Sequence, residues 1–161
     1  MKKFLNKYKG GIIVVVLLLL FVLLSVLTEA GSKKNPKDEI NLDKLTEEGT
    51  SWVEETESDE YVVTVLAQTT CSHCINYKPV ITALQETYGF KLYWFEVDQL
   101  YSEGREEDYK AVTEYYGLKK YNGTPHTYIT KSGELVVEQG GAVTDSEQLK
   151  EFLVANKVIA E

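Results

Sequence analysis

The chain has 161 residues, 43% of them hydrophobic, and a formal net charge of −8. This length and composition predict one domain with an ordinary hydrophobic core and an N-terminal appendage. The acidic balance, without a strong basic patch, argues against binding to nucleic acid.

The N-terminus predicts a membrane anchor. Residues 1–11 contain four lysines and no acid, and we assign them as a cytoplasmic N-terminus. Residues 12–28 follow and are almost wholly apolar. At about 1.5 Å per residue the apolar run reaches about 24 Å, slightly less than a bilayer core of about 30 Å, and the flanking residues can lengthen it. We therefore expect a single-pass transmembrane signal-anchor at 12–28.

The sequence leaves open whether this segment is removed. Thr28-Glu-Ala30 is a passable cleavage site, and cleavage would release a secreted protein. We favour an uncleaved anchor, because the apolar run is long for a signal peptide and no cysteine follows it to accept a lipid. The lysines before the span place the following domain outside the cytoplasm, where thiols meet oxidants.

Residues 29–58 read as an acidic linker. Leu42, Leu45, Trp52 and Val53 indicate a weak helix interrupted by Gly49, and Trp52 is placed at the edge of the domain. The main domain is predicted to span residues 59–161.

A strand followed by two cysteines dominates this domain. The β-branched, apolar run from Val62 to Ala67 predicts a buried strand. Cys71 and Cys74 are the only cysteines and stand three apart where a helix would begin. Their sulfurs therefore face the same side and can form a Cys71–Cys74 disulfide.

This position favours thiolate chemistry. Unpaired N–H groups and the helix dipole at a helix N-terminus stabilise negative charge, so Cys71 is predicted to ionise more easily than a free thiol. Cys71 is then the nucleophile and Cys74 resolves the mixed disulfide. Ser72 and His73 lie between them, and an imidazolium at His73 would stabilise the thiolate and make the couple more oxidising.

The alternatives are a structural disulfide and a metal site. A bridge across two intervening residues closes a very short loop and gains little stability. Zinc prefers four ligands, and the chain offers only these cysteines with His73 and His126. We predict redox chemistry and no metal.

The remaining pattern alternates helices and strands. Ile75, Val80, Ile81, Leu84 and Tyr88 predict the core face of a helix that ends at Gly89. A strand follows at 91–97, then a polar segment at 99–108 and a helix from Tyr109 that stops at Gly117. Tyr115, Tyr116 and Tyr121 are interpreted as core residues rather than the edge of a peptide groove.

The C-terminal third predicts a hairpin and a last helix. The strands 126–130 and 134–138 flank a short turn, and Asp145 or Thr144 caps the helix that follows.

This ordered set of motifs resembles the thioredoxin superfamily. The likeness includes the Cys-X-X-Cys pair, Pro79 five residues after Cys74, Thr124-Pro125 before a strand, Phe95-Glu-Val-Asp98 and the C-terminal hairpin and helix. It covers residues 59–159 and implies an α/β, thioredoxin-like fold, with a central mixed β-sheet flanked by helices and preceded here by the transmembrane helix.

The resemblance also implies a substrate site. In thioredoxin-like folds the proline at the position of Pro125 is cis and faces the cysteines, although X-Pro bonds are cis in only about 5–6% of cases. By that analogy Thr124 pairs with the substrate backbone. His126 either tunes Cys71 or points outward.

Two departures from thioredoxin stand out. Ser72-His73 replaces the Gly-Pro dipeptide, and a histidine there resembles periplasmic oxidases, although the chain lacks their helical insertion. Val65 occupies the position of a buried, proton-transferring aspartate, which weakens the case for a general reductase.

We therefore expect a membrane-anchored, extracytoplasmic thiol–disulfide oxidoreductase of bacterial type. Its partners would be protein or peptide thiols and disulfides and a redox protein that resets the pair, with no cofactor. The anchored architecture also resembles bacteriocin transport accessory proteins. The alternatives are a redox-inactive binding, chaperone or export-accessory module and a Cu(I) or other metal carrier.

Overall fold

The computed structural model describes residues 16–20 and 35–161. Residues 16–20 are helical and lie within the predicted anchor. Among the described residues, no helix has the length and apolar character needed to cross a bilayer. The rest of the predicted anchor, the basic N-terminus and the Thr28–Ala30 cleavage site lie outside the described residues.

A compact unit spans Pro36–Glu161, so it adds residues 36–58 to the predicted 59–161 domain. Its elements are, in order, η1 (Pro36–Glu39), η2 (Leu42–Lys44), α3 (Glu47–Glu57), β1 (Val62–Ala67), α4 (Ser72–Tyr88), β2 (Lys91–Glu96), α5 (Val97–Ser102), α6 (Glu106–Glu114), β3 (His126–Lys131), β4 (Glu134–Gly140) and α7 (Ser146–Ala155).

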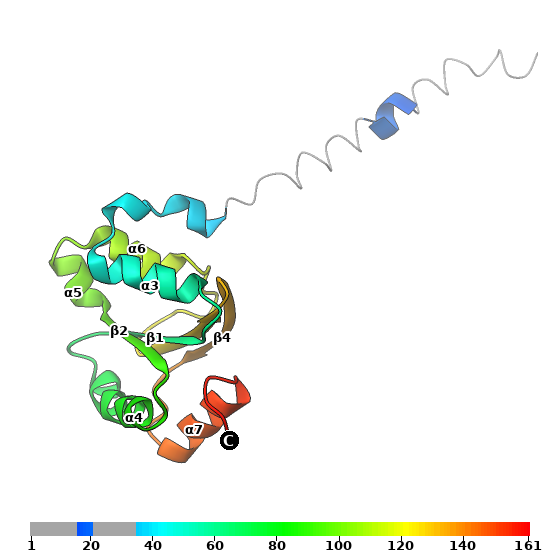
Figure 1. Cartoon of the computed structure of the whole chain (residues 1–161). Coiled ribbons are helices and arrows are strands. Elements are labelled where there is room, and N and C mark those ends of the chain that lie inside the picture. The colour runs from blue at the N-terminus through cyan, green and yellow to red at the C-terminus, as the bar shows by residue number, and fades with distance from the viewer. Residues whose placement is uncertain (1–15, 21–34) are drawn as a thin grey trace, which may run out of the picture. The chain divides into compact units, whose positions relative to one another are not determined.

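The four strands form one mixed sheet in the order β2-β1-β3-β4. β1 pairs in parallel with β2 and antiparallel with β3, and β4 pairs antiparallel with β3. Every residue of β1 is buried, as expected of an interior strand covered on both faces. Figure 1 shows α4 and α7 on one side of the sheet and α3, α5 and α6 on the other.

Each face of the sheet has its own hydrophobic core. Alternate residues of β1 point to opposite faces, so Leu66 packs with the α3, α5 and α6 side, whereas Val63 and Val65 pack with the α4 and α7 side. The predicted α/β architecture, a central mixed sheet flanked by helices, is therefore confirmed for the described domain.

Helix α3 belongs to the core, whereas the sequence suggested a weak helix in a linker. Thr46 caps it by accepting a hydrogen bond from the N–H of Gly49 at 3.3 Å. Trp52 is 0% exposed and its Nε1 donates to Thr64 Oγ1 of β1 at 3.0 Å. The placement of Trp52 at the domain edge is thus wrong. Acidic residues dominate the composition of α3, but Trp52 and Val53 lie on its buried face.

The buried face of α4 also differs from the predicted one. Cys74, Tyr77, Ile81 and Leu84 are buried, at spacings of three and four residues. Ile75 is 61% exposed and Tyr88 is also exposed, so neither belongs to the predicted core face. The shift occurs because Tyr77, rather than Ile75, faces the sheet.

The predicted helix stop at Gly89, the cap at Asp145 and the hairpin turn are confirmed, whereas the helix predicted to stop at Gly117 already ends at Glu114. Gly89 ends α4 with a φ of 71°, a left-handed conformation that glycine adopts at little cost. Asp145 caps α7 by accepting a hydrogen bond from the Gln148 N–H at 2.9 Å. Ser132 and Gly133, both with positive φ, form the turn between β3 and β4.

Candidate active site

Cys71 is the N-cap residue of α4, immediately after the loop that leaves β1. Its extended backbone, with φ −79° and ψ 109°, aims the side chain back over the first turn. The N–H of Cys74 donates to Cys71 Sγ at 3.2 Å, so the sulfur takes the place of a capping oxygen. A negative charge on this sulfur would therefore be stabilised by a backbone donor at the helix N-terminus.

The two thiols are placed in different environments. Cys71 is half-buried, whereas Cys74 is only 2% exposed. Burial opposes ionisation of Cys71, but hydrogen bonds from Cys74, Thr124 and the His73 backbone lower its pKa below the ordinary value. Burial, followed by the hydrogen bond with Cys71, raises the pKa of Cys74. Both cysteines are free thiols here.

Pro125 brings the segment before β3 against the cysteines. The Thr124–Pro125 peptide bond is cis, as the resemblance implied. The Cys71 thiol donates to the Thr124 carbonyl oxygen at 3.4 Å, across 53 residues of sequence. The structure thus unites Cys71, Cys74, Thr124 and Pro125 in one place.

Ser72 and His73 occupy the exposed first turn of α4. His73 acts on Cys71 through its backbone N–H, which contributes to lowering the Cys71 pKa. Neither side chain has a hydrogen bond to another described residue. The tuning role of the His73 imidazole therefore stays a prediction.

His126 is fully buried, which excludes the alternative that it points outward. Its Nε2 lies 3.2 Å from Glu138 Oε2, and neither ring nitrogen has a hydrogen-bond partner among the described residues. Burial lowers the His126 pKa, although Glu138 opposes this effect. Glu138 also accepts the N–H groups of Lys119 and Lys120 at 3.0 Å each, so it fixes the segment leading to Thr124.

No buried carboxylate lies at the position of Val65. Val65 is itself fully buried and pairs with Thr127 across β1 and β3. Thr127, the partner of Val65, forms a hydrogen bond through its Oγ1 with Tyr77 Oη, 3.1 Å away. Burial raises the Tyr77 pKa to about 12, so this hydroxyl stays neutral near pH 7.

Two further residues support the cysteine loop, and the sequence reading did not assign them to the site. The Gln68 carbonyl accepts the Cys71 N–H at 3.2 Å, and Gln68 Oε1 accepts the Thr124 hydroxyl at 3.2 Å. Asp98 accepts both the N–H and the hydroxyl of Thr69. Asp98 lies in the Phe95-Glu-Val-Asp98 motif, which was the available signal.

The surface beside the cysteines carries apolar and aromatic groups. The exposed Ile75 directly follows Cys74. A pocket of about 430 Å³ lies next to the cysteine loop and is lined by Gln68, Val97, Asp98, Tyr101, Tyr109 and Tyr121. Tyr115 is buried around Trp52, and the partly buried Tyr116 and Tyr121 pack against the same core, as predicted. Tyr121 also lines this pocket.

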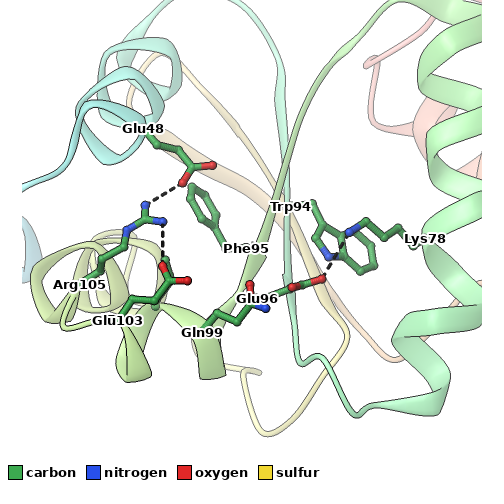
Figure 2. A pocket seen from close by; sticks show the side chains of 9 residues that line it. Glu48, Lys78, Trp94, Phe95, Glu96, Gln99, Glu103 and Arg105 are labelled. Atoms are coloured by element: carbon green, nitrogen blue, oxygen red, sulfur yellow. Dashed lines mark hydrogen bonds and ion pairs between the residues drawn. The ribbon is translucent and has the colours of Figure 1, made fainter.

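A different pocket, of about 190 Å³, borders the outer strand β2 (Figure 2). Its charged groups already pair with one another: Arg105 contacts Glu48 at 2.7 Å and Lys78 contacts Glu96 at 3.3 Å. It contains none of the predicted site residues, so we assign it no chemistry. Within residues 16–20 and 35–161, no three His, Cys, Asp or Glu side chains are grouped as metal ligands would be.

Comparison with known proteins identifies the fold. Neither family models nor curated sequences give a match. Among solved structures, the thioredoxin of Fasciola hepatica matches with a TM-score of 0.50 and 18% identity over 66% of this chain and 89% of that one. Thioredoxin NaTrxh from Nicotiana alata matches with a TM-score of 0.51 and 17% identity over 70% and 88%. The domain therefore has a thioredoxin-like fold.

Proposed function

We propose that the chain is a thiol–disulfide oxidoreductase that acts on protein or peptide substrates through Cys71 and Cys74. The proposal is carried by one arrangement: the Cys74 N–H and the Thr124 carbonyl oxygen both lie within 3.4 Å of the Cys71 sulfur. A structural thiol pair needs neither a half-buried, ionisable first sulfur nor the neighbouring carbonyl. Solved thioredoxins with the same fold support the class of reaction.

The reaction begins at Cys71. Its thiolate attacks one sulfur of a substrate disulfide, forms a Cys71–substrate mixed disulfide and releases the other substrate sulfur as a thiolate, which takes up a proton. Cys74 then loses its proton and attacks Cys71 Sγ. This step forms the Cys71–Cys74 disulfide and releases the second substrate thiol. Two electrons pass to the substrate, and the reverse sequence oxidises a substrate dithiol.

The two pKa shifts suit this order of events. The lowered Cys71 pKa favours it as the first nucleophile, whereas the buried Cys74 stays protonated and unreactive. Part of the rise in the Cys74 pKa comes from Cys71 itself. That part disappears once Cys71 is in a mixed disulfide, so Cys74 becomes easier to ionise when it is needed.

Thr124 provides the substrate contact in this proposal. In the dithiol form its carbonyl oxygen accepts the Cys71 S–H. Ionisation of Cys71 removes that donor and frees the carbonyl for an N–H of an extended substrate strand. Backbone pairing of this kind gives affinity without strict sequence preference.

We further propose that residues 12–28 anchor the protein in the bacterial cell membrane with its redox domain outside. The support is the apolar run and the lysines that precede it. Membrane fractionation combined with protease treatment of intact cells tests this topology. Domain fragments protected from external protease would contradict it.

The decisive experiment is trapping with a Cys74→Ala protein. We expect it to accumulate mixed disulfides through Cys71, because the resolving thiol is missing, whereas Cys71→Ser should trap nothing and lose all dithiol–disulfide turnover. Full turnover in Cys71→Ser would refute the proposal. Partner capture that persists in Cys71→Ser without turnover would instead indicate a binding module.

The direction of electron flow depends on His73. If its imidazole stabilises the thiolate, the midpoint potential in a glutathione titration should lie above about −220 mV, compared with about −270 mV for thioredoxin. His73→Ala should then lower the potential, while Ser72→Ala serves as the control. A wild-type value near −270 mV would contradict an oxidant role and leave the reaction class unchanged.

A further inference from the structure

Three tyrosines and one carboxylate line the pocket beside the cysteine loop. Tyr101 comes from α5, Tyr109 from α6 and Tyr121 from the segment before Pro125, while Asp98 lies at the start of α5. The volume of about 430 Å³ falls within the range of about 300–1,000 Å³ typical of ligand pockets. None of these tyrosines has a role in the reaction described above.

Two residues that line the pocket, Gln68 and Asp98, also form hydrogen bonds with the candidate active site. Gln68 holds both Cys71 and Thr124 through hydrogen bonds, and Asp98 holds Thr69. A substrate strand that pairs with Thr124 would therefore pass close to Gln68, which lines the pocket. A side chain close in sequence to the reacting cysteine can enter it.

The pocket carries a negative charge and no positive one. Among the described residues that line it, Asp98 is the only charged one. Hydrogen bonds from the Thr69 side chain and backbone lower the Asp98 pKa, so the carboxylate is ionised at neutral pH. The Thr69 hydroxyl and N–H and the backbone N–H groups of Asp98 and Gln99 all act on this carboxylate, so it contributes a fixed negative charge to the pocket.

Tyr101 is the aromatic residue of the pocket whose ring is exposed to a cation, while Tyr109 and Tyr121 are partly buried. Tyr101 is 68% exposed, and its ring meets that of Tyr109 edge to face at a centroid distance of 6.2 Å. Elsewhere in residues 35–161 lysines lie over aromatic rings, for example Lys131 over Tyr61 at 4.3 Å. Within the described chain no lysine or arginine lies over the three pocket tyrosines.

We propose that this pocket binds a lysine or arginine side chain that flanks the reacting cysteine of the substrate, and so selects basic peptides and proteins. Tyrosine faces attract a cation through their quadrupole, and Asp98 supplies the opposite charge. The net charge of −8 favours the approach of a basic substrate. The inference rests on the proposed oxidoreductase function and names the substrate class of that site.

The test uses the full-length protein and short peptides that differ only at the residue next to one cysteine: lysine, arginine, alanine, leucine or glutamate. Each peptide is made as a mixed disulfide, to measure kcat/KM, and with serine in place of cysteine, to measure binding. We expect lysine and arginine peptides to react and bind about three- to tenfold better than the alanine peptide. Equal values for all peptides, or a preference for leucine, would overturn the inference.

Variants assign the preference to the pocket. In Tyr101→Leu and Tyr109→Leu, which keep an apolar side chain but lose the aromatic face, the lysine-to-alanine ratio should fall towards one. Tyr88→Leu, at an exposed tyrosine in the last turn of α4, is the control and should keep the wild-type ratio. An unchanged ratio in both pocket variants would refute the assignment.

The two readouts separate this inference from the proposed function. Turnover of all peptides at one rate would support the oxidoreductase and overturn the pocket assignment. Tighter binding of the lysine peptide without turnover of any disulfide would support the pocket and refute the oxidoreductase. Neither turnover nor a binding preference would refute both.

Discussion

At the scale of single residues, Cys71 and Cys74 differ because of one helix start. Cys71 precedes the first turn of α4 and receives backbone donors, whereas Cys74 is already inside the helix on its buried face. The two cysteines are only three positions apart, yet the pKa of Cys71 is lowered whereas burial raises the pKa of Cys74. This asymmetry is what a nucleophile and a resolving thiol require.

The asymmetry predicts the order and pH dependence of alkylation. In the reduced protein, limiting iodoacetamide should modify Cys71 first, and the rate should rise with pH to a midpoint below that of a free thiol, about 8.5. Peptide mapping after alkylation at several pH values measures both quantities. In Cys71→Ser, the remaining Cys74 should react more slowly than a small thiol at the same pH.

A Cys71 that titrates at or above the midpoint of a free thiol would contradict this prediction. So would preferential modification of Cys74.

At the scale of elements, the hairpin β3–β4 fixes the segment that carries Thr124. His126 begins β3 directly after Pro125, and Glu138 of β4 binds the backbone of Lys119 and Lys120. His126 meets Glu138 on one side and the ring of Tyr121, at 5.4 Å, on another. The hairpin therefore supports the substrate segment from behind.

Burial of His126 predicts a loss of stability in mild acid. Its folded-state pKa is lowered, so below the unfolded value of about 6.5 the unfolded chain binds a proton that the folded chain does not. The contribution of His126 is complete above that pH and falls as pH drops towards the folded pKa. Urea unfolding at pH 7 and pH 5.5 should show a lower midpoint at pH 5.5.

In His126→Asn this acid-dependent loss should shrink, because no imidazole remains to be protonated on unfolding. His73→Asn makes the same substitution at the exposed histidine and serves as the matched control. If His126→Asn loses as much stability on acidification as the wild type, the loss has another origin.

At the scale of the whole molecule, the domain depends on the acidic segment before β1. Thr46 of this segment accepts a hydrogen bond from Arg105 Nη2 at 3.1 Å and donates from its hydroxyl to the buried Asp108 at 2.6 Å. Trp52 then fills the core between α3 and the sheet, against Phe95 and Tyr115. Residues 36–58 of this segment are therefore part of the folding unit.

Two truncations test this boundary. A fragment of residues 36–161 should fold cooperatively, because it contains the whole compact unit. A fragment of 59–161 loses Trp52, and loss of a buried tryptophan side chain alone costs about 3–5 kcal/mol of a total stability of about 5–15 kcal/mol. Thermal unfolding followed by circular dichroism should show a much lower midpoint for the shorter fragment, and equal midpoints would contradict the assignment of α3 to the core.

The local pattern of the sequence determined the strand β1, the helix start at Cys71, the stop at Gly89, the cap at Asp145 and the hairpin turn. These features depend on residues that are close in sequence, such as the apolar run of β1 or the left-handed conformation that glycine accepts. The resemblance of the ordered motifs to the thioredoxin superfamily further predicted the fold and the cis peptide bond before Pro125. Together they also placed Cys71, Cys74 and Thr124 in one site.

Only the tertiary structure decided the contacts between distant segments. The burial of His126 against Glu138, the entry of Trp52 into the core and the exposure of Ile75 depend on which element packs on which face of the sheet. The pocket of Tyr101, Tyr109 and Tyr121 likewise joins three segments whose local sequence is polar. Periodicity reports which residues share a face of one element, but the neighbour of that face is fixed only when the whole sheet and its helices assemble.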